Sequence, residues 1–351
     1  VGGECERCGT EVIQKDIEQW FFRITKYAER LLNNLDKLDW SEKIKIAQKN
    51  WIGRSEGALI TFSLDPVPYA PCSALEVFTT RPDTLFGVTF LVISPELAKT
   101  WMDEGWQASD GVKKYVEESL ARRAKNNGGT KEKTGIFSGL HAANPADQEK
   151  IPVWVSEYVL AGYGTGAIMA VPAHDERDFA FAKKFKLPIE VVVTPKSGSV
   201  SKEFSMLSEE EKVKYYEREI SEKGAFTGFG IVVNSDQFSF LPSEQAKWEI
   251  TKFVGGKRKV HYRLRDRLIS RQRYWGPPIP MIFCEACKTA GRGERKNMPG
   301  WHPVPEKDLP VKLPFVKNFR PRGTGASPLA SVKSFYETKC PLCKARARRE
   351  T

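Results

Sequence analysis

The chain has 351 residues, 40% of them hydrophobic, and a formal net charge of +11. It exceeds the ~100 to 200 residues of a typical domain, so it can bury more than one core. No apolar run approaches the ~20 residues of a membrane span and no signal peptide is visible, which predicts a soluble protein without a membrane partner. The excess of cations fits a solvated basic surface and an RNA partner equally well.

An amphipathic helix is the first element predicted along the chain. From Ile13 to Leu38, apolar side chains recur every three or four residues, which is the spacing of one helix face. The aromatic side chains of this stripe, such as Trp20 and Phe21, are expected to pack in a core rather than to bind a ligand. The pattern therefore predicts one continuous helix.

One α/β domain is predicted from about Gly57 to Phe253, because short β-branched runs alternate with helical segments there. The helix expected from Ser208 to Ile220 is rich in charged residues, which indicates a surface position. The elements predicted in this part of the chain include helices at 110–126, 208–220 and 243–254 and a strand at 231–234.

A polar segment follows one of the predicted strands. Residues 79–84 read Thr-Thr-Arg-Pro-Asp-Thr and come directly after the apolar run 74–78. Pro82 ends the strand, because proline has no N–H to donate. Three hydroxyl groups and a cation at a strand end can hold a ribose or an ester, although an ordinary turn would also use these residues.

A glycine-rich segment lies about ninety residues further on, at 162–178. Its glycines let the backbone approach a ligand closely, and a small-residue strand and Pro172 follow them. Asp175 and Asp178 fall in the first turn of the next helix, where carboxylates suit the helix dipole and can also meet an ammonium group. A capped helix is the alternative, but the two segments together favour a functional site.

Four of the seven cysteines predict a metal site. They form two Cys-x-x-Cys pairs, a spacing that lets two pairs of thiolates share one tetrahedral Zn²⁺, and a disulfide is the weaker alternative. About fifty residues separate the pairs, and the Pro- and Gly-rich part, Pro299 to Pro328, is expected to be an irregular exposed loop. The predicted ligands are Cys284, Cys287, Cys340 and Cys343.

The other three cysteines are not expected to hold a metal tightly. Cys5 and Cys8 form half of a second knuckle, so they are predicted to be unpaired thiols or weak ligands. Cys72 has no base nearby in the sequence and is expected to be a packed or exposed thiol rather than a nucleophile.

The two site segments resemble the threonine-rich strand and the GTGA-to-HDxRD segment of the editing domain in leucyl-tRNA synthetases, class I enzymes that hydrolyse wrongly charged tRNA. The flanks agree, since residues 19–28 and 50–57 resemble the approach to that domain and residues 262–280 resemble the return from it. The resemblance covers nearly the whole chain. A synthetase for isoleucine or valine fits the Trp20-Phe21-Phe22 run less well.

The resemblance implies an α/β fold, in which an editing domain of mixed strands and helices is inserted in a split Rossmann-like catalytic domain with a zinc-ribbon insertion. The HIGH and KMSKS motifs of the family's ligase site are absent and the chain starts at Val1, so we expect an internal piece of a longer protein. The expected parts are 1–54, a catalytic-domain portion with half a zinc knuckle and the long helix; 55–254, the editing domain; 255–283, the return into the catalytic domain; and 284–351, the zinc ribbon and following segment.

The resemblance also implies roles for individual residues. Thr84 would exclude the γ-branched leucine side chain, and Asp178 would pair with the substrate's α-ammonium group. Arg81 would lie near the terminal phosphate, while the other catalytic threonines would hold the ribose, the ester carbonyl or the attacking water. The catalytic set is Thr79, Thr80, Arg81, Thr84 and Asp178, and the substrate-binding set is Tyr163, Met169, Val171 and Asp175.

The expected function is hydrolysis of misacylated tRNA(Leu). The intact enzyme would ligate leucine to tRNA(Leu) with ATP and Mg²⁺, whereas this piece would need only structural Zn²⁺, as a cytoplasmic monomer. The alternative is a zinc-stabilised tRNA-binding module with an inactive editing pocket. Three simpler interpretations also stay open: Arg81 could pair with Asp178, the Thr84 hydroxyl could bond the backbone, and Met169 and Val171 could belong to the core rather than to a pocket. His174 as a general base is disfavoured, because positioned water and the substrate's vicinal hydroxyl suffice.

Overall fold

A computed structural model of the chain describes residues 18–65, 72–125, 134–159, 165–195, 208–270, 277–317, 319 and 327–351. The chain divides into two compact units. The larger unit is Leu32–Leu264, and the smaller unit combines Val1–Leu31 with Arg265–Thr351. Helix α1 (Ala28–Leu35) spans the boundary between them. Within the described residues, no helix is both long and apolar enough to cross a membrane.

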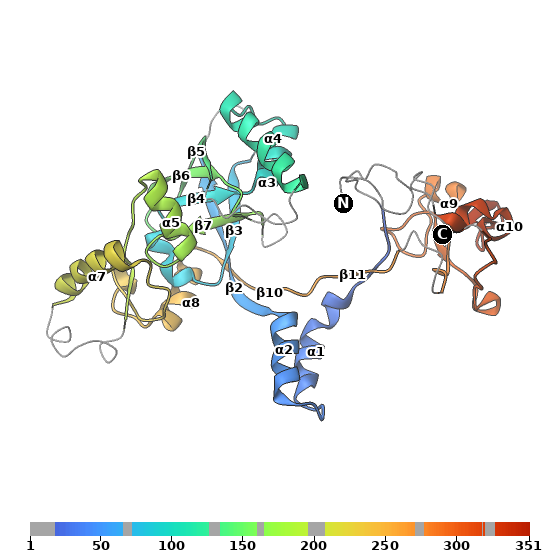
Figure 1. The fold of residues 1–351 in the computed structure, drawn as a ribbon, viewed down its shortest axis with the longest axis horizontal. Coiled ribbons are helices and arrows are strands. Elements are labelled where there is room, and N and C mark those ends of the chain that lie inside the picture. Colours follow the sequence, from blue (N-terminus) through green and yellow to red (C-terminus); the bar gives the residue numbers. More distant parts are fainter. Residues whose placement is uncertain are drawn as a thin grey trace. The chain divides into compact units, whose positions relative to one another are not determined.

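The larger unit is built on a mixed sheet that, within the described residues, has seven strands in the order β10-β2-β5-β6-β4-β7, with β3 paired to β2 (Figure 1). Strands β4 and β6 are parallel, and the other pairs are antiparallel. This confirms a mixed α/β fold. The strands are β2 (Arg54–Leu64), β3 (Ala74–Thr79), β4 (Phe90–Ile93), β5 (Ile136–Ala143), β6 (Lys150–Val155), β7 (Ala167–Ala170) and β10 (Lys257–Tyr262). A separate pair is formed by β8 (Val193–Thr194) and β9 (Ile231–Val232).

Helices cover both faces of this sheet, and strand β4 shows how. Leu91 and Ile93 pack in the main core with α3, α4 and α8, whereas Phe90 and Val92 pack on the other face with Phe181 of α5. Alternate side chains of a strand point to opposite faces, so a sheet buried on both sides reads as a continuous apolar run. The helices of this unit are α2 (Glu42–Ile52), α3 (Pro95–Asp103), α4 (Asp110–Lys125), α5 (Glu176–Phe185), α7 (Glu209–Lys223) and α8 (Ser243–Phe253), with 3₁₀ turns η2 (Pro82–Gly87) and η4 (Asp236–Phe238).

The predicted helices α4, α7 and α8 are confirmed to within a few residues. Helix α7 begins with a capping box, in which the Ser208 hydroxyl accepts from the Glu211 N–H and the Glu211 carboxylate accepts from the Ser208 N–H. One side of this charged helix is buried through Tyr216 and Ile220. The strand predicted at 231–234 is shorter, as β9.

The smaller unit contains, within the described residues, a four-stranded sheet in the order β13-β12-β15-β14 and a two-stranded pair β1-β11. Its core is small and is centred on the cysteine pairs. The elements are β1 (Phe21–Phe22), η1 (Ile24–Tyr27), β11 (Arg267–Leu268), β12 (Met281–Phe283), α9 (Glu285–Thr289), β13 (Trp301–Pro303), η5 (Glu306–Asp308), η6 (Pro328–Ser331), α10 (Lys333–Tyr336), β14 (Glu337–Lys339) and β15 (Arg346–Arg349).

The helix predicted from Ile13 to Leu38 is confirmed only over Ala28–Leu35, and one continuous helix is wrong for the described residues before it. Residues 21–22 form a strand, 24–27 a 3₁₀ turn, and only 28–35 an α-helix. Phe21 pairs with Leu268, and the Asp266 carboxylate accepts from both the Thr25 N–H and its hydroxyl. These distant partners take backbone groups that a helix would need, so tertiary pairing overrides the apolar period. Phe21 and Phe22 are exposed rather than part of a core.

The irregular loop predicted from Pro299 to Pro328 is also partly wrong. Residues 301–303 form β13, which pairs with β12, and His302 and Val304 are buried. A backbone pairing with Met281–Phe283 gives this proline-rich stretch a regular element that composition alone does not reveal.

Candidate active site

The two site segments come together because β3, which ends at Thr79, lies next to β7. The approach of strand β2 to the end of β3 depends on Gly57, where an added Cβ would lie 2.1 Å from the Thr79 carbonyl oxygen. After β3 comes turn η2, whose last residue, Gly87, lies close to Val171, the residue that follows β7. A Cβ added at Gly87 would be 3.3 Å from the Val171 side chain. The contact between β3 and β7 thus brings together segments that are about ninety residues apart in sequence.

The threonine-rich segment is organised by its own hydrogen bonds. The Thr79 hydroxyl accepts from the Arg81 N–H at 3.0 Å, and the Thr84 hydroxyl donates to the Arg81 carbonyl at 2.8 Å. Thr80 is exposed, whereas Thr84 is only 1% exposed. The bond to the backbone that the sequence left open for the Thr84 hydroxyl is therefore present.

Arg81 is held from three directions. Its Nε and Nη2 bond the Asp83 carboxylate at 3.0 and 2.9 Å, and its Nη1 donates to the Thr227 carbonyl at 3.1 Å. Its guanidinium carbon lies 4.6 Å from the centre of the Phe229 ring. The pairing with Asp178 that was considered is not formed. Asp83, fully buried, and Phe229 are partners that the sequence reasoning missed.

The carboxylate of Asp178 is buried and is held without an ion pair. Only 4% of the residue is exposed; Oδ2 accepts from the Val171 N–H at 2.9 Å and Oδ1 from the Tyr158 hydroxyl at 3.1 Å. Among the described residues, no Lys or Arg forms an ion pair with it. Burial, and then the charge of Asp175, raise the pKa of Asp178 to about 7. This carboxylate is therefore short of a positive partner.

Tyr158 belongs to the site although no sequence motif marks it. It follows strand β6, and only the sheet order brings it beside α5. Burial, and then the charge of Asp178, raise the pKa of Tyr158 well above its usual value, so the phenol stays protonated and can donate to the carboxylate.

Asp175 caps helix α5. Its Oδ1 accepts from the backbone N–H groups of Arg177 and Asp178, and its carboxylate also pairs with the Arg177 side chain at 3.0 Å. Burial alone would raise the pKa of Asp175, but the bonds and charge of Arg177 lower it. Asp175 thus fixes the first turn of the helix that carries Asp178.

Met169 and Val171 share one face at the end of β7, and both are buried in the main core beside Leu85 of η2. This places two of the predicted substrate-binding residues on the same side as the threonine-rich turn. Tyr163, the other pocket residue predicted, lies outside the described residues.

His174 is bonded at both ring nitrogens. Nδ1 lies 2.9 Å from the Phe226 carbonyl oxygen, and Nε2 lies 3.1 Å from the backbone nitrogens of both Val192 and Val193. Because Nε2 faces two N–H donors it must be the acceptor, so Nδ1 carries the proton. Burial lowers the pKa of His174 to about 4, which leaves the ring neutral at physiological pH.

The smaller unit holds a candidate metal centre. The sulfur atoms of Cys284, Cys287, Cys340 and Cys343 all lie within 4.8 Å of one another, with the closest pairs at 3.5 to 3.8 Å. A disulfide would need ~2.05 Å, whereas a tetrahedral site with ~2.3 Å metal–sulfur bonds needs sulfurs about 3.8 Å apart. The four thiols can therefore hold one metal ion. Cys5 and Cys8 lie outside the described residues.

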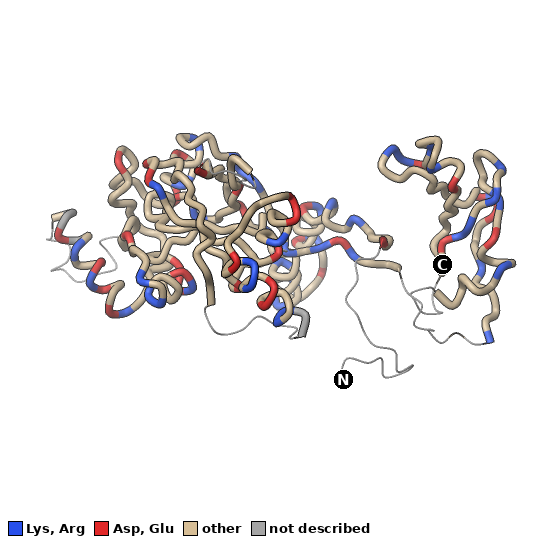
Figure 2. Tube along the Cα trace, turned by 90° about the horizontal axis from the view of Figure 1, so that it is seen from above, with Lys and Arg blue, Asp and Glu red and all other residues tan. Residues whose placement is uncertain are grey.

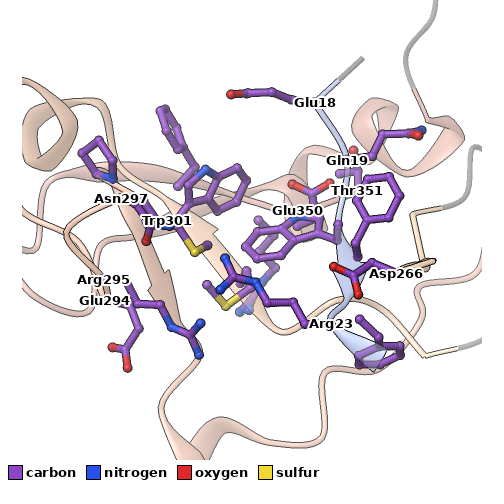
Figure 3. A pocket seen from close by; sticks show the side chains of 18 of the residues that line it. Glu18, Gln19, Arg23, Asp266, Glu294, Arg295, Asn297, Trp301, Glu350 and Thr351 are labelled. Atoms are coloured by element: carbon purple, nitrogen blue, oxygen red, sulfur yellow. The ribbon is translucent and has the colours of Figure 1, made fainter. Parts of the chain in front are cut away.

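A separate cavity, built only from residues of the smaller unit, is shown in Figure 3. Aromatic side chains such as Trp20 and Trp301 line it together with Arg23, Asp266 and Glu350. None of the predicted site residues contributes to it.

Comparisons with known proteins identify the family. Residues 49–255 match the sequence profile of the leucyl-tRNA synthetase editing domain, and the chain belongs to this family. It is 47% identical to leucine–tRNA ligase of Elusimicrobium minutum over 99% of the chain and 38% of that protein. It is 44% identical to leucine–tRNA ligase subunit alpha of Aquifex aeolicus, covering 54% of that subunit.

A solved structure is also similar. It is the ternary complex of Agrobacterium radiobacter LeuRS, tRNA and LeuAMS, which matches all of this chain and 36% of its own chain, with a TM-score of 0.60 and 33% identity. The chain thus spans about two fifths of the length of curated relatives such as the Elusimicrobium and Petrotoga mobilis ligases. The resemblance to leucyl-tRNA synthetase is confirmed.

We expect Asp178→Asn to stabilise the protein in the absence of substrate. The pKa of Asp178 in the folded protein, about 7, is raised above the ordinary value of 3.8. Folding therefore favours the protonated acid, and the folded protein loses stability as the pH rises from 4 to 7 and this acid ionises. The gain from Asn should grow over this window to at most about 4 kcal/mol at pH 8. The Asn amide can still accept from Val171 and donate to the Tyr158 oxygen.

Urea unfolding of both proteins between pH 4 and 8 measures the gain. Asp83→Asn is the matched control, because the Asp83 carboxylate is buried but paired with Arg81; this variant should give no stabilisation at pH 8. A difference between Asp178→Asn and the parent that is flat with pH would contradict the buried, partner-free carboxylate.

Proposed function

We propose that the chain is an aminoacyl-tRNA hydrolase that edits misacylated tRNA(Leu). The observation that supports this best is the buried carboxylate of Asp178, which has two hydrogen-bond donors and forms no ion pair with a described Lys or Arg. An aminoacyl ester brings an α-ammonium group whatever its side chain, and it would lower the pKa of Asp178 and form a charge-assisted bond with it. One contact would thus hold every substrate in the same place.

The threonine-rich turn would act on the ester. Thr80 is exposed and Thr79 is partly exposed, so both would orient the ester carbonyl, the ribose or the attacking water. Arg81, which is 20% exposed at its side chain, would lie near the terminal phosphate. The substrate's vicinal hydroxyl, rather than a protein base, would assist the water. The buried and fully bonded His174 does not suit the role of general base.

Selectivity would come from the side-chain pocket. Met169 and Val171 would line it, with Tyr163 beside it and Asp175 as a secondary polar contact. The γ-methyl of Thr84 would collide with the branched leucine side chain. One methyl group separates substrates by only ~1 to 3 kcal/mol, which is why a second, hydrolytic selection would be useful after ligation.

We also propose the setting of this site. The larger unit would be an editing domain, 55–254 in the predicted division, inserted in a split Rossmann-like catalytic domain represented by 1–54 and 255–283, with a zinc ribbon at 284–351. The intact cytoplasmic monomer would ligate leucine to tRNA(Leu) with ATP and Mg²⁺. Zn²⁺ would be bound by the four clustered thiols, where it would stabilise the small core around them.

Two substitutions of Thr84 separate its methyl group from its hydroxyl. Thr84→Ser keeps the bond to the Arg81 carbonyl and removes the methyl, whereas Thr84→Val keeps the methyl and removes the hydroxyl. If the methyl excludes leucine, Thr84→Ser should hydrolyse leucyl-tRNA(Leu) about 10-fold faster or more, and Thr84→Val should spare it.

Deacylation of leucyl- and norvalyl-tRNA(Leu) is the assay, since norvaline lacks one methyl of leucine at Cγ. The parent should hydrolyse the norvalyl ester and spare the leucyl ester. A parent that binds both tRNAs but hydrolyses neither would be the inactive RNA-binding module instead. Equal sparing of leucyl-tRNA(Leu) by both variants would remove Thr84 as the discriminating residue.

Metal analysis should find close to one zinc per chain. Cys287→Ser should abolish zinc binding, because it removes a ligand from a closed four-sulfur set. Cys72→Ser, the matched control, should keep the zinc and lose one of three titratable thiols, the others being Cys5 and Cys8. Two tightly held zincs, or full zinc content in Cys287→Ser, would contradict the site.

A further inference from the structure

Charge alone does not reveal how the site is held. Lys and Arg (blue) and Asp and Glu (red) are scattered among other residues along the trace (Figure 2). Arg81 is held by the Asp83 carboxylate and also by an irregular segment, Phe226 to Phe229. This segment supplies the Thr227 carbonyl to the Arg81 guanidinium and the Phe229 ring beneath it.

The segment has no regular secondary structure of its own between α7 and β9. Its first residue is bonded twice to the segment after β7: the Phe226 N–H donates to the Ala173 carbonyl at 2.8 Å, and the Phe226 carbonyl lies 2.9 Å from His174 Nδ1. Its far end is tied to α8, where Gly230 and Ser243 exchange hydrogen bonds. His174 is therefore the side chain that fixes the end of the segment nearest to Thr227.

The same imidazole is anchored on its other side. Nε2 accepts from the N–H groups of Val192 and Val193, next to strand β8. The residue itself is 7% exposed. The ring thus bridges the β8 region and the Phe226 carbonyl, and it can do so only as the neutral tautomer with the proton on Nδ1. The low pKa of about 4 agrees with this state.

We infer that His174 is a positioning residue for Arg81: its imidazole fixes the Phe226–Phe229 segment, and that segment holds the guanidinium where the terminal phosphate of the substrate would bind. The role of the phosphate rests on the proposed editing function. The link between His174 and Arg81 rests on the hydrogen bonds alone. His174 itself touches neither the ester nor the water in this account.

Two conservative variants divide the bonds of His174. In His174→Asn the amide nitrogen can take the place of Nδ1 and donate to Phe226, whereas in His174→Gln the amide oxygen can take the place of Nε2 and accept from Val192. If the bond to Phe226 positions Arg81, His174→Gln should raise KM for norvalyl-tRNA(Leu) about 10-fold with little change in kcat. His174→Asn keeps this bond, so its KM should stay within about 3-fold of the parent value.

A small substrate and a double variant complete the test. On 3′-O-norvalyl-adenosine, which lacks the terminal phosphate, parent and Gln variant should hydrolyse at similar rates. In an Arg81→Gln background, His174→Gln should add nothing further to KM for the tRNA substrate. Equal losses by Asn and Gln, on both substrates and regardless of Arg81, would mean that His174 serves only the general fold and would overturn the inference.

Measurements that do not depend on catalysis separate the positioning role of His174 from the proposed editing function. Melting temperatures of the parent, His174→Gln, Arg81→Gln and the double variant should be non-additive, because each single change loosens the same segment. The rate of hydrogen exchange at the amides of residues 227–229 should rise in His174→Gln and stay near the parent's rate in His174→Asn. If the melting temperatures and hydrogen exchange behave in this way but the parent does not deacylate norvalyl-tRNA(Leu), the editing proposal fails and the link between His174 and Arg81 stands. Additive shifts in melting temperature together with unchanged hydrogen exchange would overturn the link.

Discussion

The buried carboxylate of Asp178 is the constraint on which the rest of the site depends. An ionised group in an apolar interior is tolerated only when donors or an opposite charge compensate for lost water. Here the Val171 N–H and the Tyr158 hydroxyl supply two bonds, and the pKa of about 7 shows that these do not fully compensate for burial. The carboxylate therefore forms no ion pair with a described residue, and the α-ammonium group of the proposed substrate would supply one.

The surrounding fold is arranged to keep that carboxylate in place. The Asp175 cap fixes the start of α5, and Phe181 of the same helix packs against Phe90 of the sheet, with ring centres 5.3 Å apart. The β7 strand that precedes the helix is paired along its length with β4. The site is thus built from the ends of paired strands and a capped helix, while Arg81 depends on an irregular segment and on His174.

Features that depend on short stretches of sequence could be predicted, whereas contacts between residues far apart in the chain could not. The threonine-rich segment and the glycine-rich segment with their flanks are short patterns from which the family was identified, and the spacing of the cysteine pairs predicted a metal site. The Asp175 cap corresponds to the capped helix that was only the alternative interpretation of its segment. Tyr158 and Phe229 carry no pattern, because only strand order and a long connection place them beside Asp178 and Arg81. The helix predicted through Phe21 failed for the same reason, since its backbone pairs with a strand more than two hundred residues away. Periodicity reports which side chains are apolar, but it does not report which backbone groups find partners elsewhere.

The most direct test of the central claim is whether Asp178 recognises the α-ammonium group. Deacylation of norvalyl-tRNA(Leu) and of its N-acetyl derivative, which has no ammonium charge, should be measured with the parent and with Asp178→Asn after subtraction of the uncatalysed rates. Loss of a buried charge pair costs ~2 to 5 kcal/mol, so the parent should prefer the free amine by about 30-fold or more, and the variant should show no preference. The same preference in both proteins would show that Asp178 does not bind the ammonium group, and the account of the site would be wrong.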